Sequence, residues 1–418
     1  MDEQRDIYLE KVPDQVYQHM VDLFEQDYHF KNGEKMRLAN YYVGISRTLS
    51  NHFVQFIDEV KQGIIQKKHP HLSIPDGFTP HLDNLLSTEA SADVSFASYD
   101  MAVTEQGLQN IEFQAVATYP VSAARLNKCL LDSLPATKAH IFADSSATTW
   151  DDFIRFYASL IAGNASEGVI ITDRLVAQQK TNFEFYATQK ELNASIEIVD
   201  MKHIFEQDQT LFYTPPGKAQ QPIKVERLYN RILLAEALFE DDYPQDSSIW
   251  NFRFDKHYEN LKFVNHPVKS FEVSKRLSPY IQHPFNPACF ELSAVAQDFR
   301  NGLLKYDDYV WKHKWGAAGH RLILSPNATI LEELNPDLKD YIAQKKVNFK
   351  VFKTADGQEK IVELRFMTAT LHQQTIIVPM ARIGHVTQKD NGEKTFKIHF
   401  GDNNKEGYGF SPVIIFDE

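Results

Sequence analysis

The stretch from Tyr309 to Leu324 carries the strongest structural signal in this chain. Two apolar runs flank a short loop of small residues, and this pattern predicts a β-hairpin. Lys312 stands at the end of the first run, and Gly316 and Gly319 follow in the loop. Glycine lets backbone N–H groups approach an anion closely, and lysine adds a mobile positive charge that suits phosphate. The stretch therefore predicts a phosphate-covering loop that is not a Walker A loop, with an ordinary glycine turn as the alternative.

Length and composition describe an ordinary globular protein with a large core. The chain has 418 residues, of which 43% are hydrophobic and 24% charged, and we expect two or three domains. Its net charge of −12 argues against binding to nucleic acid or to an anionic membrane surface. We see neither a membrane span nor a signal peptide. Cys129 and Cys289 fit no metal or disulfide spacing, which favours a reducing, cytoplasmic location.

A second predicted hairpin carries oxygen-bearing side chains. Residues 94–103 and 108–115 have the character of strands and are joined by a short turn. Asp100 and Glu112 then lie on paired strands, and Gln114 shares a strand face with Glu112 because side chains repeat every two residues. Such oxygens suit Mg²⁺, which prefers a few carboxylates together with phosphate oxygens and water. The alternative is an amphipathic hairpin with a solvated polar face.

The remaining pattern mixes helices with two kinds of sheet. Helical spacing of apolar residues predicts helices within 14–68 and 121–165. Strand, helix and strand within 168–200 predict a βαβ unit, and no GxGxxG dinucleotide fingerprint accompanies it. Residues 305–418 read as mainly antiparallel strands. Arg231 lies where a predicted strand runs into a predicted helix, and it could hold a carboxylate or phosphate or simply be a surface residue.

Taken together, these segments resemble the ATP-grasp superfamily. Within it they resemble the circularly permuted branch that includes the glutathionylspermidine synthetases. That branch has a magnesium segment of the form Asp, about a dozen residues, then Glu-x-Asn, and this chain has Asp100 and Glu112-Phe113-Gln114. It also has a nucleotide loop similar to Lys-Pro-x-Trp-Gly-x-x-Gly, which corresponds to residues 312–319. Gln114 stands where the family has Asn, and His313 where it has Pro.

Three further segments extend the resemblance, which spans roughly residues 94–416. Residues 342–347 resemble the strand of the adenine hinge, and residues 168–200 resemble the pre-grasp βαβ region with its Glu-Phe pair. Residues 229–232 are similar to a strand that ends in Tyr-x-Arg-(Ile/Leu).

The resemblance implies an α/β (α+β) fold with an ATP-grasp core in permuted order. The implied division is a helical N-terminal region, a metal-binding hairpin with helices, a βαβ pre-grasp domain, and a nucleotide-binding lobe with the C-terminal sheet. These four regions correspond to residues 1–90, 91–150, 151–262 and 263–418.

The resemblance also implies a site for ATP and Mg²⁺. The side chains of Lys275 and Lys312 and the loop Gly316, Ala317, Ala318 and Gly319 would hold the phosphates. Further contacts with the nucleotide would come from Gln344, Lys345 and Val347. The metal ligands would be Asp100, Glu112 and Gln114. The candidates for binding a carboxylate or stabilising the transferred phosphoryl group are Arg231, Arg365 and Arg382.

The implied reaction joins a carboxylate to an amine. ATP would phosphorylate a small-molecule or peptide carboxylate to an acyl phosphate, and an amine would displace phosphate to give an amide, with release of ADP. The alternatives are an ATP-grasp kinase acting on a small-molecule hydroxyl, a nucleotide-binding protein without turnover, and a structural scaffold. The sequence names neither the acid nor the amine, and it gives no oligomeric state.

Overall fold

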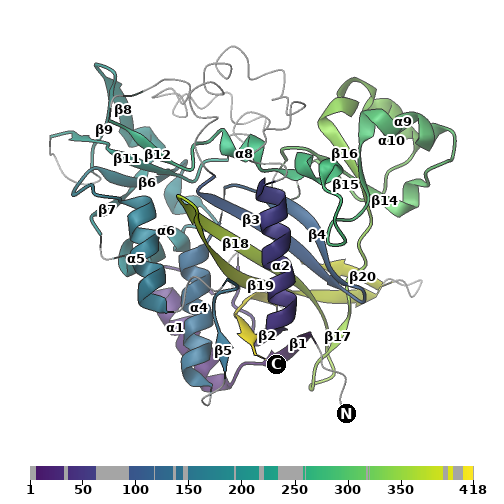
Figure 1. Cartoon of the computed structure of the whole chain (residues 1–418), viewed down its shortest axis with the longest axis horizontal. Coiled ribbons are helices and arrows are strands. Elements are labelled where there is room, and N and C mark those ends of the chain that lie inside the picture. The colour runs from purple at the N-terminus through teal and green to yellow at the C-terminus, as the bar shows by residue number, and fades with distance from the viewer. Residues whose placement is uncertain are drawn as a thin grey trace.

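A seven-stranded antiparallel sheet forms the centre of the protein (Figure 1). The computed structural model describes residues 6–32, 36–62, 94–116, 118–134, 138–144, 149–192, 194–215, 221–233, 258, 260–316, 319, 321–388, 394–398 and 408–417. Within this part, the strand order is β20-β19-β18-β3-β4, with β17 paired to β18 and β21 to β19. The bounds are β3 (Phe96–Thr104), β4 (Gly107–Gln114), β17 (Phe352–Lys353), β18 (Glu359–Leu371), β19 (Gln374–Gln388), β20 (Lys394–Lys397) and β21 (Gly409–Ser411).

Both faces of this sheet are covered, and for this reason every residue of β18 except the first and the last is buried. Helix α2 (Arg47–Val60) lies across one face (Figure 1), where Phe53 stacks on Phe366 with ring centroids 3.8 Å apart. The next residue, Met367, points to the opposite face, as the two-residue repeat of a strand requires. It packs there in a cluster with α4 (Pro120–Ser133) and α5 (Trp150–Ile161).

A parallel sheet confirms the predicted βαβ unit at residues 168–200. Its order is β12-β11-β6-β7, and each pair of neighbours is parallel. Helix α6 (Phe183–Glu191) makes the crossover between β6 (Val169–Asp173) and β7 (Ile196–Asp200). Strand β11 (Arg227–Asn230) confirms the predicted strand. The helix predicted to follow it is wrong for residues 231–233, which are irregular, and its remainder lies outside the described residues. Strand β12 (Lys262–Val264) completes the sheet, and a small sheet of β8 (Ile204–Gln207), β9 (Thr210–Tyr213) and β10 (Ile223–Lys224) follows β7.

A small antiparallel lobe contains the predicted hairpin of residues 309–324 (upper right in Figure 1). Its strand order is β13-β16-β14-β15. The hairpin is confirmed, because Trp311 and Lys312 of β14 pair antiparallel with Ile323 and Leu322 of β15. The elements of the lobe are β13 (Cys289–Glu291), α9 (Leu292–Arg300), β14 (Tyr309–His313), β15 (Leu322–Ile323), α10 (Ala328–Glu333) and β16 (Tyr341–Lys345). Trp311 is fully buried in the core of this lobe.

The N-terminal segment is not helical throughout, which corrects the prediction for residues 14–68. Helices α1 (Asp14–Asp27) and α2 were predicted, but β2 (Tyr41–Ser46) lies between them. This strand is buried at every position, so its sequence shows no alternation that separates a strand from a helix. It pairs with β1 (Ile7–Lys11) and with β22 (Val413–Phe416), which also pairs with β5 (Ala139–His140). The rest of the predicted helical segment, from residue 63, lies outside the described residues. None of the helices in the described part combines the length and apolarity needed to cross a membrane.

A buried carboxyl group joins two helices beside the parallel sheet. The Glu184 side chain on α6 accepts hydrogen bonds from the backbone N–H groups of Val121 and Ser122, at 3.1 and 2.9 Å. These two N–H groups belong to the first turn of α4, where a helix leaves its N–H groups without intrahelical partners. Burial raises the pKa of Glu184 to about 7, although the hydrogen bonds from Ser122 and the charge of Arg231 oppose this shift.

This raised pKa makes part of the stability dependent on pH. In the unfolded chain the carboxyl titrates near 4.5, so the folded protein binds the proton more tightly. Tighter proton binding in the folded state adds to the free energy of unfolding. This contribution is fully present below pH 4.5 and is lost as the pH rises through about 7. We expect the unfolding free energy of the wild type to fall by about 3 kcal/mol relative to Glu184→Gln as the pH rises through this window. Urea denaturation across the window measures this difference, and parallel curves for the two proteins would contradict it.

Candidate functional site

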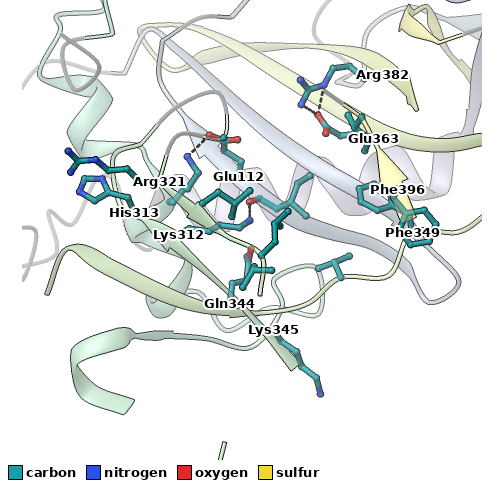
Figure 2. Close-up of a pocket in the computed structure, with 18 residues that line it drawn as sticks. Glu112, Lys312, His313, Arg321, Gln344, Lys345, Phe349, Glu363, Arg382 and Phe396 are labelled. Atoms are coloured by element: carbon teal, nitrogen blue, oxygen red, sulfur yellow. Dashed lines mark hydrogen bonds and ion pairs between the residues drawn. The ribbon is translucent and has the colours of Figure 1, made fainter. Parts of the chain in front are cut away.

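A cavity of about 260 Å³ opens between the small lobe and the central sheet (Figure 2). Its lining comes from β4, β14, β15, β16, β18, β19 and β20, from the loop between β14 and β15, from the segments that follow β15, β16 and β20, and from Lys275. The charged residues of the wall are Glu112, Lys275, Lys312, Arg321, Lys345, Glu363 and Arg382. Its apolar residues include Leu322, Leu324, Val347, Phe349, Phe396 and Ile398.

The apolar wall keeps large hydrophobic side chains in contact with solvent. Leu324 is 62% exposed and Phe396 is 38% exposed, which is unusual for residues of this size. The rings of Phe349 and Phe396 lie against one another, with centroids 6.0 Å apart (Figure 2). Exposed apolar groups gathered in a concave wall mark a surface that a ligand can cover.

Lys312 connects the lobe to the central sheet. It lies on β14, and its Nζ donates a hydrogen bond of 2.7 Å to the carbonyl of Ile111 on β4 (Figure 2). Burial, with the nearby charge of Lys275, lowers the pKa of Lys312 to about 8, although Glu112 opposes the shift. A lysine with this pKa is charged at neutral pH but loses its proton readily.

Glu112 and Lys275 form an ion pair in the wall of the cavity. Nζ of Lys275 lies 2.6 Å from Oε1 of Glu112, and it also donates to the carbonyl oxygen of Gly316. Lys275 begins the short 3₁₀ helix η5 (Lys275–Tyr280), which lies beside β4 and β16. Burial alone would raise the pKa of Glu112, but Lys275 and Lys312 outweigh burial and lower it. The carboxyl group is therefore ionised at neutral pH.

Two carboxylates and two arginines form a buried network on the neighbouring strands. The strand register sets Asp100 opposite both Glu112 and Arg365, and Glu363 opposite Arg382. Arg365 binds Asp100 and also donates to the hydroxyl of Tyr119 at 2.5 Å. Arg382 binds Glu363, and its Nη2 lies 3.7 Å from Oδ2 of Asp100.

The cavity brings together most of the residues that the sequence singled out. Those that line it are Glu112, Lys275, Lys312, Gly319, Gln344, Lys345, Val347 and Arg382. Gln114 and Gly316 line a smaller neighbouring cavity, together with Glu112 and Lys275. Asp100 and Arg365 line neither of these cavities, because they are paired with one another inside the sheet. Ala317 and Ala318 lie outside the described residues.

Arg231 is the predicted residue that lies away from this cavity. It is 3% exposed and donates to the carbonyl of Thr118, and its Nη2 lies 3.5 Å from the hydroxyl of Thr181. The chain turns away from β11 at this point, so the side chain enters the packing near Glu184. These contacts give Arg231 a structural role, and its predicted role with a substrate remains a prediction.

Sequence reasoning missed Glu363, Arg321 and the aromatic pair Phe349 and Phe396. Glu363 had a usable signal, because it lies two residues before Arg365 on a strand with alternating polar residues, and so on the same face. Arg321 directly precedes β15 in the predicted hairpin, but neither its charge nor its position distinguished it. The two aromatic side chains meet only in the folded protein and had no local signal.

The side chains of the cavity offer too few oxygen ligands to hold a hard cation such as Mg²⁺ unless phosphate oxygens supply the others. Among the described residues, no three His, Cys, Asp or Glu side chains gather in a way that could hold a metal. Glu112 and Glu363 nevertheless present carboxylates to the cavity. Mg²⁺ is commonly held by one or two carboxylates, with substrate phosphates and water as the remaining ligands. The residues thus fit a magnesium ion that arrives with a nucleotide.

Comparison with known proteins adds little to this description. No family model and no curated protein matches the chain significantly. One similar solved structure, from Methylobacillus flagellatus KT, is described as that of a proposed gamma-glutamylcysteine synthetase. The likeness has a TM-score of 0.38 and 10% sequence identity, and it covers 85% of this chain and 86% of the other. So distant a likeness carries no argument, and the function must be argued from the residues themselves.

Proposed function

We propose that this protein is an ATP- and Mg²⁺-dependent ligase that joins a carboxylate to an amine and releases ADP and phosphate. The observation that carries the proposal is that apolar and cationic side chains line one and the same cavity. A nucleoside triphosphate needs both kinds of contact, because its base is flat and weakly polar and its phosphates are strongly anionic. The base would lie against Phe349 and Phe396, and the phosphates would face Lys275 and Lys312.

The cationic wall supports binding of the triphosphate. Lys312 and Lys275 come from different segments but face the same part of the cavity. Gly319, with a φ of +83° that only glycine adopts easily, lies in the same wall. In the proposed complex the two lysines neutralise the phosphates, and backbone N–H groups of the glycine loop cover them. No protein nucleophile is required, because positioning and charge stabilisation supply most of the catalysis in phosphoryl transfer.

Glu112 would be the main magnesium ligand in this proposal. Its carboxylate lines both the larger cavity and the smaller one that contains Gln114, so metal and amide oxygen could act together. When bound, the ion would bridge phosphate oxygens and neutralise the charge that develops on them. The metal role predicted for Asp100 stays a prediction, since its Oδ2 is bound by Arg365 and its Oδ1 accepts a hydrogen bond from Ser98.

The remaining residues support transfer to a carboxylate rather than hydrolysis by water. A carboxylate oxygen of the acid substrate would attack the γ-phosphorus, ADP would leave, and the amine would then displace phosphate from the acyl carbon. Arg382 and Arg321 add positive charge to the cavity, and Arg382 is held in place by Glu363. Such arginines suit a carboxylate as well as a transferred phosphoryl group. The resemblance of the sequence to the permuted ATP-grasp branch favours the ligase over the kinase.

Trapping of the acyl phosphate tests this function. The protein is incubated with ATP, Mg²⁺ and pools of amino acids and small peptides, with hydroxylamine in place of the amine. We expect ADP and a hydroxamate that appear together and only with one acid, because hydroxylamine attacks acyl phosphates. The matched control is Glu112→Gln, which keeps the shape of the side chain but is a poorer ligand for Mg²⁺. Release of AMP and pyrophosphate would overturn the acyl-phosphate route, and a phosphorylated hydroxyl would establish the kinase instead.

A further inference from the structure

The ion pair between Lys275 and Glu112 stands between two cavities. Both side chains line the large cavity and also the smaller one, of about 30 Å³, that Gln114 and Trp315 help to enclose. They are 12% and 21% exposed, so the pair is largely shielded from water. Lys275 also holds the carbonyl oxygen of Gly316. One ammonium group thus joins the candidate metal ligand to the start of the glycine loop.

The charges around this pair disfavour a free divalent cation. The carboxylates in and under the cavity wall are Asp100, Glu112 and Glu363, and each of them has a cationic partner. The cations outnumber these carboxylates, and they are Lys275, Lys312, Arg321, Lys345, Arg365 and Arg382. A metal ion that entered alone would add two positive charges to a group that is already positive. At this degree of burial, solvent screens such repulsion only weakly.

A nucleoside triphosphate reverses this balance, because it brings several negative charges into the same cavity. Of the partners around the carboxylates, Lys275 is the one that can exchange most easily. Arg365 is fixed between Asp100 and Tyr119 inside the sheet, whereas Lys275 lies in the cavity wall at the end of a flexible stem. Movement of Lys275 to a phosphate would leave the carboxylate of Glu112 open to a metal.

We propose that Lys275 is an exchangeable counter-ion that occupies the metal ligand Glu112 until a nucleotide arrives. This inference rests on the proposed function and adds an order of binding to it. The nucleotide enters before the divalent cation, or together with it, and the free protein binds the cation only weakly. Lys275 therefore acts twice, first as the substitute for the metal and then as a ligand of phosphate.

Binding of Mn²⁺ tests the exchange without any need for turnover. Free Mn²⁺ is followed by electron paramagnetic resonance while it is titrated into the wild type and into Lys275→Met. Without nucleotide we expect Lys275→Met to bind Mn²⁺ about tenfold more tightly than the wild type, which corresponds to about 1.4 kcal/mol. The Mn²⁺ that a non-hydrolysable ATP analogue holds without protein is measured separately and subtracted. Beyond this amount the analogue should tighten Mn²⁺ binding to both proteins, by a factor about ten times larger in the wild type than in Lys275→Met, where no lysine has to leave Glu112.

The matched control is Lys269→Met. The side chain of Lys269 is 2% exposed and its Nζ lies 2.8 Å from Glu272, so it is a buried lysine in a close ion pair that lines neither cavity. Its loss should leave the affinity for Mn²⁺ unchanged. The double variant Glu112→Gln/Lys275→Met should lose the gain, which would locate the ion at Glu112.

Several outcomes would overturn the inference. One is a Lys275→Met protein that binds Mn²⁺ no more tightly than the wild type. Another, which needs no variant to fold, is a wild type that binds Mn²⁺ equally with and without the analogue. If either result is found while the wild type binds both the analogue and Mn²⁺, the proposed exchange of Lys275 is wrong and the proposed function stands. A wild type that binds no analogue would instead remove the proposed function, while the gain in Lys275→Met still tests the ion pair by itself.

Discussion

Replacement of Arg365 by leucine is expected to lower the free energy of unfolding by about 3–5 kcal/mol, because it removes the closest cationic partner of the buried carboxylate of Asp100. Arg365 is 8% exposed in its side chain, and Asp100 is 1% exposed. Burial alone would lower the pKa of Arg365, but Asp100, Tyr119 and Glu363 outweigh burial and raise it. The guanidinium is therefore charged at every accessible pH, and its loss removes a permanent charge from the sheet.

Urea denaturation of three variants separates the loss of a partner from the loss of packing. Asp100→Asn/Arg365→Leu should recover part of the stability, because it no longer buries a carboxylate that has lost its closest partner. Arg300→Leu is the surface control, since Arg300 pairs with Glu332 at 2.9 Å but the two side chains are 31% and 64% exposed. Exposed pairs contribute about 1 kcal/mol or less. A loss in Arg365→Leu no larger than in Arg300→Leu would show that the buried network does not stabilise the sheet.

Local patterns in the sequence were enough to predict the two hairpins of the site. Asp100 and Glu112 are separated by a tight turn, so their pairing depends only on neighbouring residues, and they are indeed opposite in the sheet. The hairpin that carries Lys312 has the same local character. In both cases the two-residue repeat of a strand and the glycine of the turn point to the same structure. The βαβ unit was predictable for a similar reason.

Pairings between distant segments could not be predicted in this way. The partner of Asp100 is Arg365, which lies 265 residues further along the chain. Strand β2 was missed because it is buried at every position and so shows no alternation, and one of its two partners, β22, lies at the other end of the chain. Arg231 shows the same limit, since an arginine at the end of a strand suggested a ligand site, and local sequence could not reveal that it packs inside the protein, where its role with a substrate stays a prediction. Only the tertiary structure decides which charged residues face the cavity.

Replacement of Lys312 by methionine is expected to weaken binding of an ATP analogue by about ten- to a hundredfold. One charge-assisted contact with phosphate contributes about 1.5–3 kcal/mol, which corresponds to this range. The fold should survive, because methionine keeps most of the apolar stem, and the lost bond to the carbonyl of Ile111 is a single contact at the cavity wall. Isothermal titration calorimetry measures the affinity, and circular dichroism checks the fold.

The pH dependence of binding identifies Lys312 more sharply than affinity alone. Because burial lowers the pKa of Lys312 to about 8, the free protein loses this charge as the pH rises above 8. The phosphates favour the charged form, so binding above pH 8 must take up a proton, and the affinity should fall by up to about tenfold per pH unit. Lys312→Met should show no such fall, and neither should Lys312→Arg, since arginine keeps its proton. A wild type whose affinity is constant between pH 7 and about pH 9.5 would mean that the phosphates do not contact Lys312, and the nucleotide would have to be placed elsewhere in the cavity.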